Sequence, residues 1–238
     1  MKTLARIFCA LALLASMVTP TSAATSKSMM FEFRTEFYNP EVDSAFESAT
    51  PYETAFGTEF MWGFGGYVDY QLIQDYGSLA VGVGLSYKSI VGEAAEAESD
   101  DETSLNLMPI SAGLTYRFDM LAHKWAIPVV PYAKFGLIAA IWWVTNGKGD
   151  VANTRNPVSP YEERTGWSTT LGLYYGGGIQ FLLDVFSDRM AATMDNEMGV
   201  NNSYLFVEYL RHSLNDFGSE DSIELSSDGI SCGLMFEF

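Results

Sequence analysis

The residues of this chain that could perform catalysis lie near its C-terminus. His212 and Ser213 are adjacent, and Glu224 follows in the next polar segment. A hydrolase uses these residue types, with histidine as the base that activates a serine hydroxyl. The surrounding segment alternates like a β-strand, in which adjacent side chains point to opposite faces. We therefore predict that His212 and Ser213 form no catalytic pair and that the protein is not an enzyme.

Two polar segments rich in carboxylates are the next candidates, because carboxylate oxygens bind Ca²⁺ or Mg²⁺. They hold Glu93, Glu96, Glu98, Asp100, Asp101 and Glu102, and then Asp216, Glu220, Asp221 and Glu224. Neither segment has the spacing of a dedicated calcium loop. We predict solvated surface charge here, with no metal site and no cofactor.

Charged residues also recur inside segments that are otherwise apolar, always on the polar side of an alternating pattern. They are Glu32, Arg34, Glu36, Asp69, Lys88, Arg117, Lys134 and Glu208, and the same side also carries Glu59 and Glu237. Such a set could line a narrow path for ions. It could instead form a closed core of salt bridges.

Eight segments position these charges, and each alternates between a bulky apolar side and a side of small or polar residues. They are residues 30–38, 58–72, 79–89, 107–118, 129–143, 167–183, 203–213 and 229–238. The polar side is rich in Gly, Ala, Ser and Thr. Long polar connectors at 39–57, 92–104, 146–166 and 215–228 alternate with shorter ones at 74–78 and 120–126. The eight segments therefore predict a sheet of antiparallel strands.

The connector over residues 184–202 has the features of a helix. Ser187 can cap its start, Phe186, Met190 and Met194 share a face, and Gly199 can end it.

A membrane strand needs about 9–11 residues, and a spanning sheet must close on itself because hydrocarbon offers no hydrogen bonds. Small inward residues suit an eight-stranded barrel, whose interior barely holds side chains. The pattern thus predicts an all-β, closed antiparallel eight-stranded transmembrane barrel with one short periplasmic helix. An even strand number leaves both chain ends on the same side, and with the short turns in the periplasm the four long connectors lie outside the cell. The narrow interior favours the closed salt-bridge core over the ion path.

The composition agrees with an exported membrane protein. The 238 residues carry a formal net charge of −17, which disfavours nucleic-acid binding. Residues 1–23 have Lys2 and Arg6, then an apolar run, then small residues ending at Ala23. This is the layout of a secretory signal peptide, so residues 24–238 are expected to form the barrel domain. Cys232 would be the single cysteine left, so no internal disulfide is expected.

The C-terminal strand also resembles the last strand of bacterial outer-membrane β-barrels, which ends in alternating hydrophobics and a terminal Phe. Leu234, Phe236 and Phe238 match that pattern, and the resemblance implies recognition by the barrel-assembly machinery. Eight strands make the chain similar to the small OmpA/OmpX-like class. The stretches "FYNPEVDSAF", "YRFD", "PYAKFGL" and "GVNNSYLFVEY" resemble a myxobacterial outer-membrane barrel family that has no assigned activity.

These observations predict a monomeric outer-membrane protein in contact with the bilayer and lipopolysaccharide. Its predicted role is non-catalytic, either in envelope structure or in interactions at the cell surface. A small porin-like channel, or a carrier for ions or apolar molecules, is the alternative, and a lipid-modifying enzyme is the third hypothesis.

Overall fold

The computed structural model describes residues 28–46, 49–74, 77–93, 102–125, 127–155, 163–219 and 222–238. The predicted signal peptide and most of the acidic segment 93–102 lie outside these ranges.

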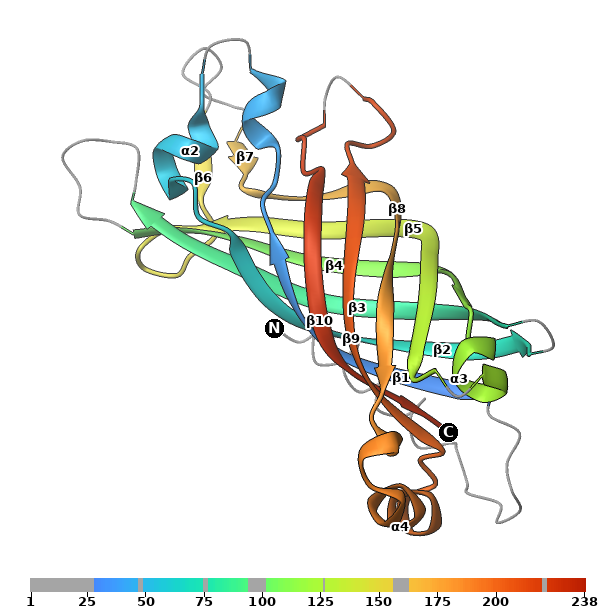
Figure 1. The fold of residues 1–238 in the computed structure, drawn as a ribbon. Helices are drawn as coiled ribbons and strands as arrows, with labels where there is room; N and C mark the ends of the chain where they lie inside the picture. The colour runs from blue at the N-terminus through green and yellow to red at the C-terminus, as the bar shows by residue number, and fades with distance from the viewer. Residues whose placement is uncertain are drawn as a thin grey trace.

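Eight antiparallel strands close into a barrel, which confirms the predicted fold class (Figure 1). In chain order they are β1 (Met29–Tyr38), β2 (Met61–Ile73), β3 (Ser78–Glu93), β4 (Glu102–Arg117), β5 (Val129–Thr145), β8 (Trp167–Leu182), β9 (Asn202–Leu214) and β10 (Ser227–Glu237). Each strand pairs with its neighbours in the chain, and β1 pairs with β10 to close the ring. Closure leaves no strand edge with unpaired backbone groups.

Strands β3 and β4 are longer than the sequence pattern predicted. Their pairing continues from Ser78 opposite Arg117 to Glu93 opposite Glu102, which makes both strands 16 residues long. The clean alternation fades near residues 90–106, although the backbone ladder continues there. Backbone pairing with a neighbour can therefore extend a strand beyond its amphipathic part.

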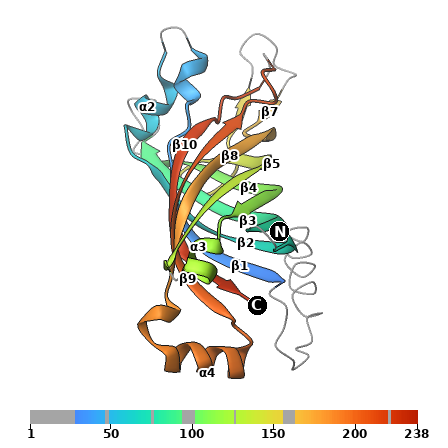
Figure 2. The same cartoon turned by 45° about the vertical axis from the view of Figure 1, so that its right-hand side comes forward.

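The two ends of the barrel carry different additions. At one end, here called the loop end, lie the 3₁₀ turn η1 (Val42–Ala45), the helix α2 (Pro51–Phe56) and the short hairpin β6 (Asn153–Arg155) and β7 (Glu163–Thr165) (Figure 1). The opposite end, here called the helix end, carries α3 (Met120–Trp125), η2 (Asp184–Phe186), α4 (Asp188–Met198) and the C-terminus (Figure 2).

Helix α4 confirms the helix predicted over residues 184–202. It follows Ser187 directly and ends before Gly199, whose φ of 73° is the left-handed conformation that glycine adopts readily. The elements α2, α3, β6 and β7 were not predicted, since each spans only three to six residues. None of the helices in the described ranges is long and apolar enough to cross a membrane.

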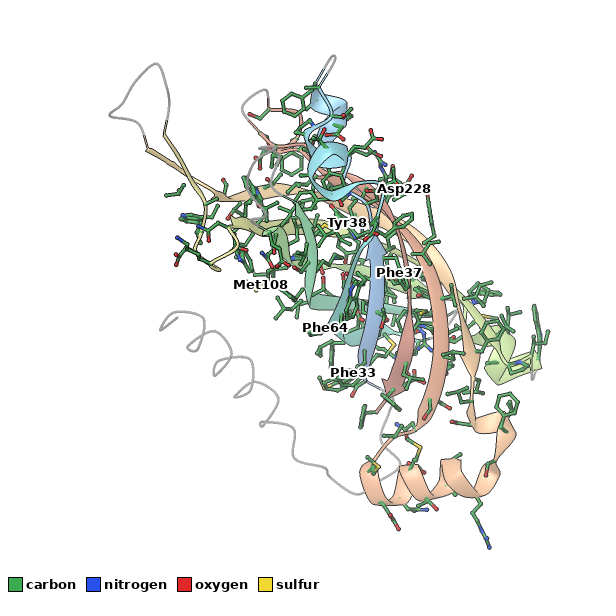
Figure 3. The ribbon with its side chains drawn as sticks, turned by 90° about the vertical axis from the view of Figure 1, so that its left-hand side faces the viewer. Phe33, Phe37, Tyr38, Phe64, Met108 and Asp228 are labelled. Carbon is green, nitrogen blue, oxygen red and sulfur yellow. The ribbon has the colours of Figure 1, made fainter. Side chains whose placement is uncertain are left out.

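The outer surface of the barrel is apolar over most of its height. On β1 and β2, Phe33 and Phe64 are 63% and 62% exposed, and Figure 3 shows both along that wall together with Phe37. The same holds around the ring for Val83, Leu114, Phe135, Leu137, Leu171, Ile179, Val207, Ile230 and Leu234. Such a large exposed apolar band is rare on soluble proteins and marks contact with another apolar phase.

Candidate functional site

The interior of the barrel collects the charged residues singled out in the sequence. Glu32, Arg34 and Glu36 alternate along β1, so the two-residue period of the strand turns all three inward. The eight predicted residues are each no more than 5% exposed: Glu32, Arg34, Glu36, Asp69, Lys88, Arg117, Lys134 and Glu208. Glu237 joins them at 1% exposure.

The prediction was wrong for Glu59. The structure places this residue before the first residue of β2, with its side chain exposed at the loop end. The predicted strand began at residue 58, whereas β2 begins at Met61. Before Met61 no strand pairing fixes the backbone, so alternation does not specify the direction of a side chain there.

Arg34 lies at the centre of the interior network. Its guanidinium donates hydrogen bonds to the carboxylates of Glu32 and Glu208, and its Nη1 lies 3.7 Å from Glu36 Oε1. The ring of Tyr67 lies beneath the guanidinium, with the Cζ of Arg34 4.1 Å from its centroid. Three carboxylates and a π-face therefore surround one buried cation, which is the compensation that burial of a charge requires.

Lys134 ties the same carboxylates to β5. Its Nζ donates to Glu32 Oε1 at 3.0 Å and Oε2 at 2.7 Å, and it lies 3.6 Å from Glu208 Oε2. The hydroxyl of Tyr132 donates to Glu208 Oε2 at 2.8 Å. These contacts join β1, β5 and β9, which are not neighbours in the sheet. The network thus braces the barrel across its lumen.

Further ion pairs extend the network toward both ends. Toward the loop end, Lys88 pairs with Glu36 and also donates to Ser86 Oγ at 3.2 Å. Toward the helix end, Arg117 donates to Gln180 Oε1 at 2.8 Å and to Glu237 Oε1 at 3.1 Å.

Glu237 holds several strands together at the helix end. Besides Arg117, its carboxylate accepts hydrogen bonds from Gln71 Nε2 and Asn202 Nδ2, both at 2.6 Å. The sequence indicated the inward direction of Glu237 through its alternation, but it did not indicate these partners. Asn202 is the register partner of Glu237 on the neighbouring strand β9. Gln71 and Arg117 come from β2 and β4 and reach Glu237 only because the barrel closes.

Asp69 is the least compensated member. Its Oδ1 accepts a hydrogen bond from Thr115 at 3.2 Å, while its Oδ2 has no hydrogen-bond partner among the described residues. The nine buried residues comprise five carboxylates and four basic groups. Each of the other four carboxylates has an ion pair with one of these bases, and Asp69 has none among the described residues.

Two buried apolar layers lie in the interior, and Arg117 and Glu237 lie within the one at the helix end. At the loop end the layer contains Tyr38, Tyr52, Met61, Ile90, Leu105, Leu107, Ile138, Leu214 and Leu225. At the helix end it contains Met30, Ala80, Val130, Tyr132, Tyr204, Phe206 and Met235. The ion pairs that cross the lumen and these two layers fit a closed core of salt bridges better than a path for ions.

Helix α2 completes the layer at the loop end. Tyr52 is buried there, and its ring packs against Phe56 with centroids 5.2 Å apart. The Asp43 carboxylate accepts hydrogen bonds from the backbone N–H groups of Tyr52 and Glu53 at 2.7 and 2.9 Å. Burial and the nearby Asp43 carboxylate raise the pKa of the Tyr52 phenol, so it stays neutral. The first connector therefore folds back over the mouth of the barrel.

His212 and Ser213 point to opposite faces of β9. His212 is buried inside, with its ring 5.7 Å from that of Tyr38, whereas Ser213 pairs with Leu173 on the outward register. Glu224 accepts hydrogen bonds from Ser226 N at 3.0 Å and from Asn215 Nδ2 at 3.4 Å. The three residues therefore do not meet, and they form no catalytic constellation.

The acidic segments show no metal-binding arrangement where the chain is described. Asp216 Oδ1 accepts the backbone N–H of Leu171 at 2.6 Å, a structural role. Within the described ranges no group of three His, Cys, Asp or Glu side chains could hold a metal ion. Residues 94–101, Glu220 and Asp221 lie outside those ranges, as does the side chain of Glu93.

The C-terminal strand forms the seam of the barrel. Phe238 N donates to Met29 O at 2.8 Å, and Ser28 N donates to Phe238 O at 2.8 Å. The rings of Phe31 and Phe238 meet edge to face with centroids 5.2 Å apart, and Phe33 meets Phe236 at 6.4 Å. The residues of the expected assembly signal thus also join the first and last strands.

No protein-family model matches the chain, and no curated protein matches it. Among solved structures it is similar to Ail, the attachment invasion locus protein of Yersinia pestis, in complex with the heparin analogue sucrose octasulfate, at 14% identity and a TM-score of 0.44 over 89% of this chain and 97% of that chain. It is also similar to Neisserial surface protein A, at 15% identity and a TM-score of 0.46 over 88% and 96%. A third similar structure is the outer membrane enzyme PagL, at 10% identity and a TM-score of 0.39 over 87% and 98%.

Proposed function

We propose that this protein is an integral outer-membrane β-barrel with a non-catalytic role in envelope structure or surface interaction. The observation that carries the proposal is the reversal of its two faces. Large apolar side chains cover the outside, while charges fill the inside. A soluble barrel has the opposite arrangement, because water would meet the outer face. In a bilayer the outer band meets hydrocarbon and the reversal becomes favourable.

The proposed orientation has the loop end outside the cell and the helix end in the periplasm. Barrels of this class have longer extracellular loops and shorter periplasmic turns, and the connectors at the loop end fit this rule. Three tryptophans support this orientation. The strand register places Trp62, Trp143 and Trp167 in one ring, at one height near the loop end, where the outer membrane interface would lie. In this orientation the C-terminal Phe238 lies at the periplasmic rim, where the barrel-assembly machinery would meet it.

The packing of the interior supports a non-conducting role. Ion pairs between strands on different sides of the lumen, together with the buried apolar layers, fill the interior with side chains. A catalytic role has no support from the only residues that suggested one, His212 and Ser213, because they face opposite ways.

The experiment that tests the membrane proposal is refolding of residues 24–238 in detergent micelles and lipid vesicles. We expect a folded form whose gel mobility changes on boiling and a lack of single-channel events in planar bilayers. A monomer that stays soluble and folded without detergent would overturn the membrane proposal. Steady conductance would contradict a closed core and favour the channel alternative.

A further inference from the structure

A groove of about 380 Å³ opens on the outer wall of β2 and β3, near the loop end. Its lining includes Phe60, Trp62, Phe64, Tyr87, Ser89 and Val91. The rings of Phe64 and Tyr87 lie 6.3 Å apart, and Trp62 is 64% exposed beside them. The groove thus has aromatic walls on a surface that we propose to face lipid.

A polar cluster lies beside this groove, on the same outward face. Asn106 belongs to that face because Leu105 and Leu107, its neighbours on β4, are both buried inside. The hydroxyls of Tyr87 and Ser89 donate to Asn106 Oδ1 at 2.6 and 3.0 Å. Polar groups on a lipid-facing wall are costly unless they are paired, so a carboxamide and two hydroxyls there call for an explanation.

The cluster lies between two tryptophans. The strand register pairs Trp62 with Ser89, Ser89 with Asn106, and Asn106 with Trp143. Tryptophan rings mark the level at which acyl chains meet polar groups in a membrane. Asn106 therefore lies where the carbonyl groups of membrane lipids are found, and it is only 6% exposed under its neighbours.

The hydrogen-bonding capacity of Asn106 is only half used within the described residues. Its Oδ1 accepts two hydrogen bonds, while its Nδ2 donates none to that part of the chain. A carboxamide has two N–H donors, and hydrocarbon cannot accept from them. An acyl carbonyl is the acceptor that a lipid offers at this depth.

We propose that this groove binds an acyl chain of lipopolysaccharide, with the acyl carbonyl accepting a hydrogen bond from Asn106 Nδ2. The proposal rests on the membrane placement and orientation proposed above, which put the groove in the outer leaflet. Lipid A carries acyl chains in amide and ester linkage, so it supplies the carbonyl. No Lys or Arg lines the groove, and Glu59 lies at its edge, so the lipid phosphates bind elsewhere. The site therefore recognises the acyl region.

The test uses residues 24–238 refolded in detergent, with purified lipid A and phosphatidylethanolamine as the two probes. Native mass spectrometry measures which lipid stays bound, and thermal unfolding measures how far each lipid stabilises the protein. We expect lipid A to remain bound and to raise the unfolding temperature more than phosphatidylethanolamine does. Asn106→Leu should weaken lipid A binding about fivefold, the effect of one net hydrogen bond. Trp62→Ala should weaken it at least as much, since it removes a wall of the groove.

Matched variants separate binding from folding. Trp167→Ala removes a tryptophan of the same ring that does not line the groove, and it should leave lipid A binding within about twofold of wild type. Tyr87→Phe keeps the aromatic wall but removes the hydroxyl that donates to Asn106 Oδ1. It should weaken lipid A binding by less than Asn106→Leu does, and it takes the place of that variant if Asn106→Leu fails to fold. Heat-dependent gel mobility reports folding for every variant.

Two results would overturn the site while leaving the barrel in the membrane: a heat-modifiable wild type that binds no lipid A, or equal binding of both lipids. An equal loss of lipid A binding in Trp167→Ala and Trp62→Ala would also overturn it. A protein that folds without detergent would overturn the membrane proposal itself, and the site with it.

Discussion

The two faces of β1 differ more than any two regions of the protein. Phe33 is 63% exposed, and its neighbour Arg34 is 3% exposed with ion-pair partners on its own strand and on β9. Along one strand, the apolar side chains are thus displayed and the charges are buried. The charged side chains inside are stabilised by ion pairs with one another. The apolar side chains outside are stabilised by contact with a surrounding apolar phase. Each face should therefore respond to substitution in its own way.

The largest effect is expected from breaking the interior network at its centre. Arg34→Met removes the cation shared by Glu32 and Glu208 and leaves buried carboxylates with fewer partners. Removal of one partner of a buried pair costs about 3–5 kcal/mol of unfolding free energy. Urea unfolding in lipid vesicles measures this cost. Phe33→Leu, on the adjacent outward position, is the control and should change stability by less than about 1.5 kcal/mol.

A charge placed on the outer face sharpens the comparison. Leu137 lies in the middle of β5 and is 59% exposed. Leu137→Arg should destabilise the barrel by about 2–4 kcal/mol in vesicles, because the guanidinium enters the centre of the bilayer. Trp167→Arg, at the ring of tryptophans, should cost no more than about 1 kcal/mol, since charges near the interface reach water. Equal costs at the two positions would contradict a bilayer around this face.

Deletion of Phe238 tests the seam between β1 and β10. The deletion removes one apolar side chain, whose burial is worth about 1.5–3 kcal/mol. It also removes the edge contact with Phe31 and the backbone hydrogen bonds to Ser28 and Met29. We expect a modest loss of stability in refolded samples but a much larger fall in outer-membrane levels in cells, because the terminal Phe resembles a recognition signal. Immunoblots of membrane fractions measure those levels.

Glu237→Ala leaves the buried Arg117 without its carboxylate partner, so it should cost more stability in refolded samples than the deletion does, but it should reduce the membrane levels less because Glu237 lies outside the alternation of the recognition signal. Equal levels for wild type and the deletion would reject the expectation.

The smallest effect is expected outside both faces. The last pair of the β3–β4 ladder is Glu93 opposite Glu102, so the segment 94–101 can be replaced by Asn-Gly, which favours a two-residue hairpin. Stability should stay within about 0.5 kcal/mol of wild type in the same urea assay. A failure of the shortened protein to insert would mean that the acidic segment is part of the folded barrel.

The strands and their faces could be predicted from the sequence because both depend on a local property, the period of two. Arg34, Lys134 and Glu208 were recognised as inward by that period alone. Where the ladder does not reach, the same rule failed, as it did for Glu59. Helix α2 could not be predicted from its six residues, since it is stabilised by packing of Tyr52 on the barrel mouth and by the Asp43 carboxylate.

The sequence by itself determined the eight strands of the barrel, their directions and, within the strands, which side chains face inward, because alternation of residue types specifies the side of a strand. Only the tertiary structure decided which charges meet. Glu32, Lys134 and Glu208 come from three strands of the ring, and their contacts depend on the register of every ladder between them. The same is true of Asn106, whose hydroxyl partners lie on β3 and whose flanking tryptophans lie on β2 and β5. Closure of the barrel creates these neighbours, since residues distant in the chain share one height only after the strands have paired in register.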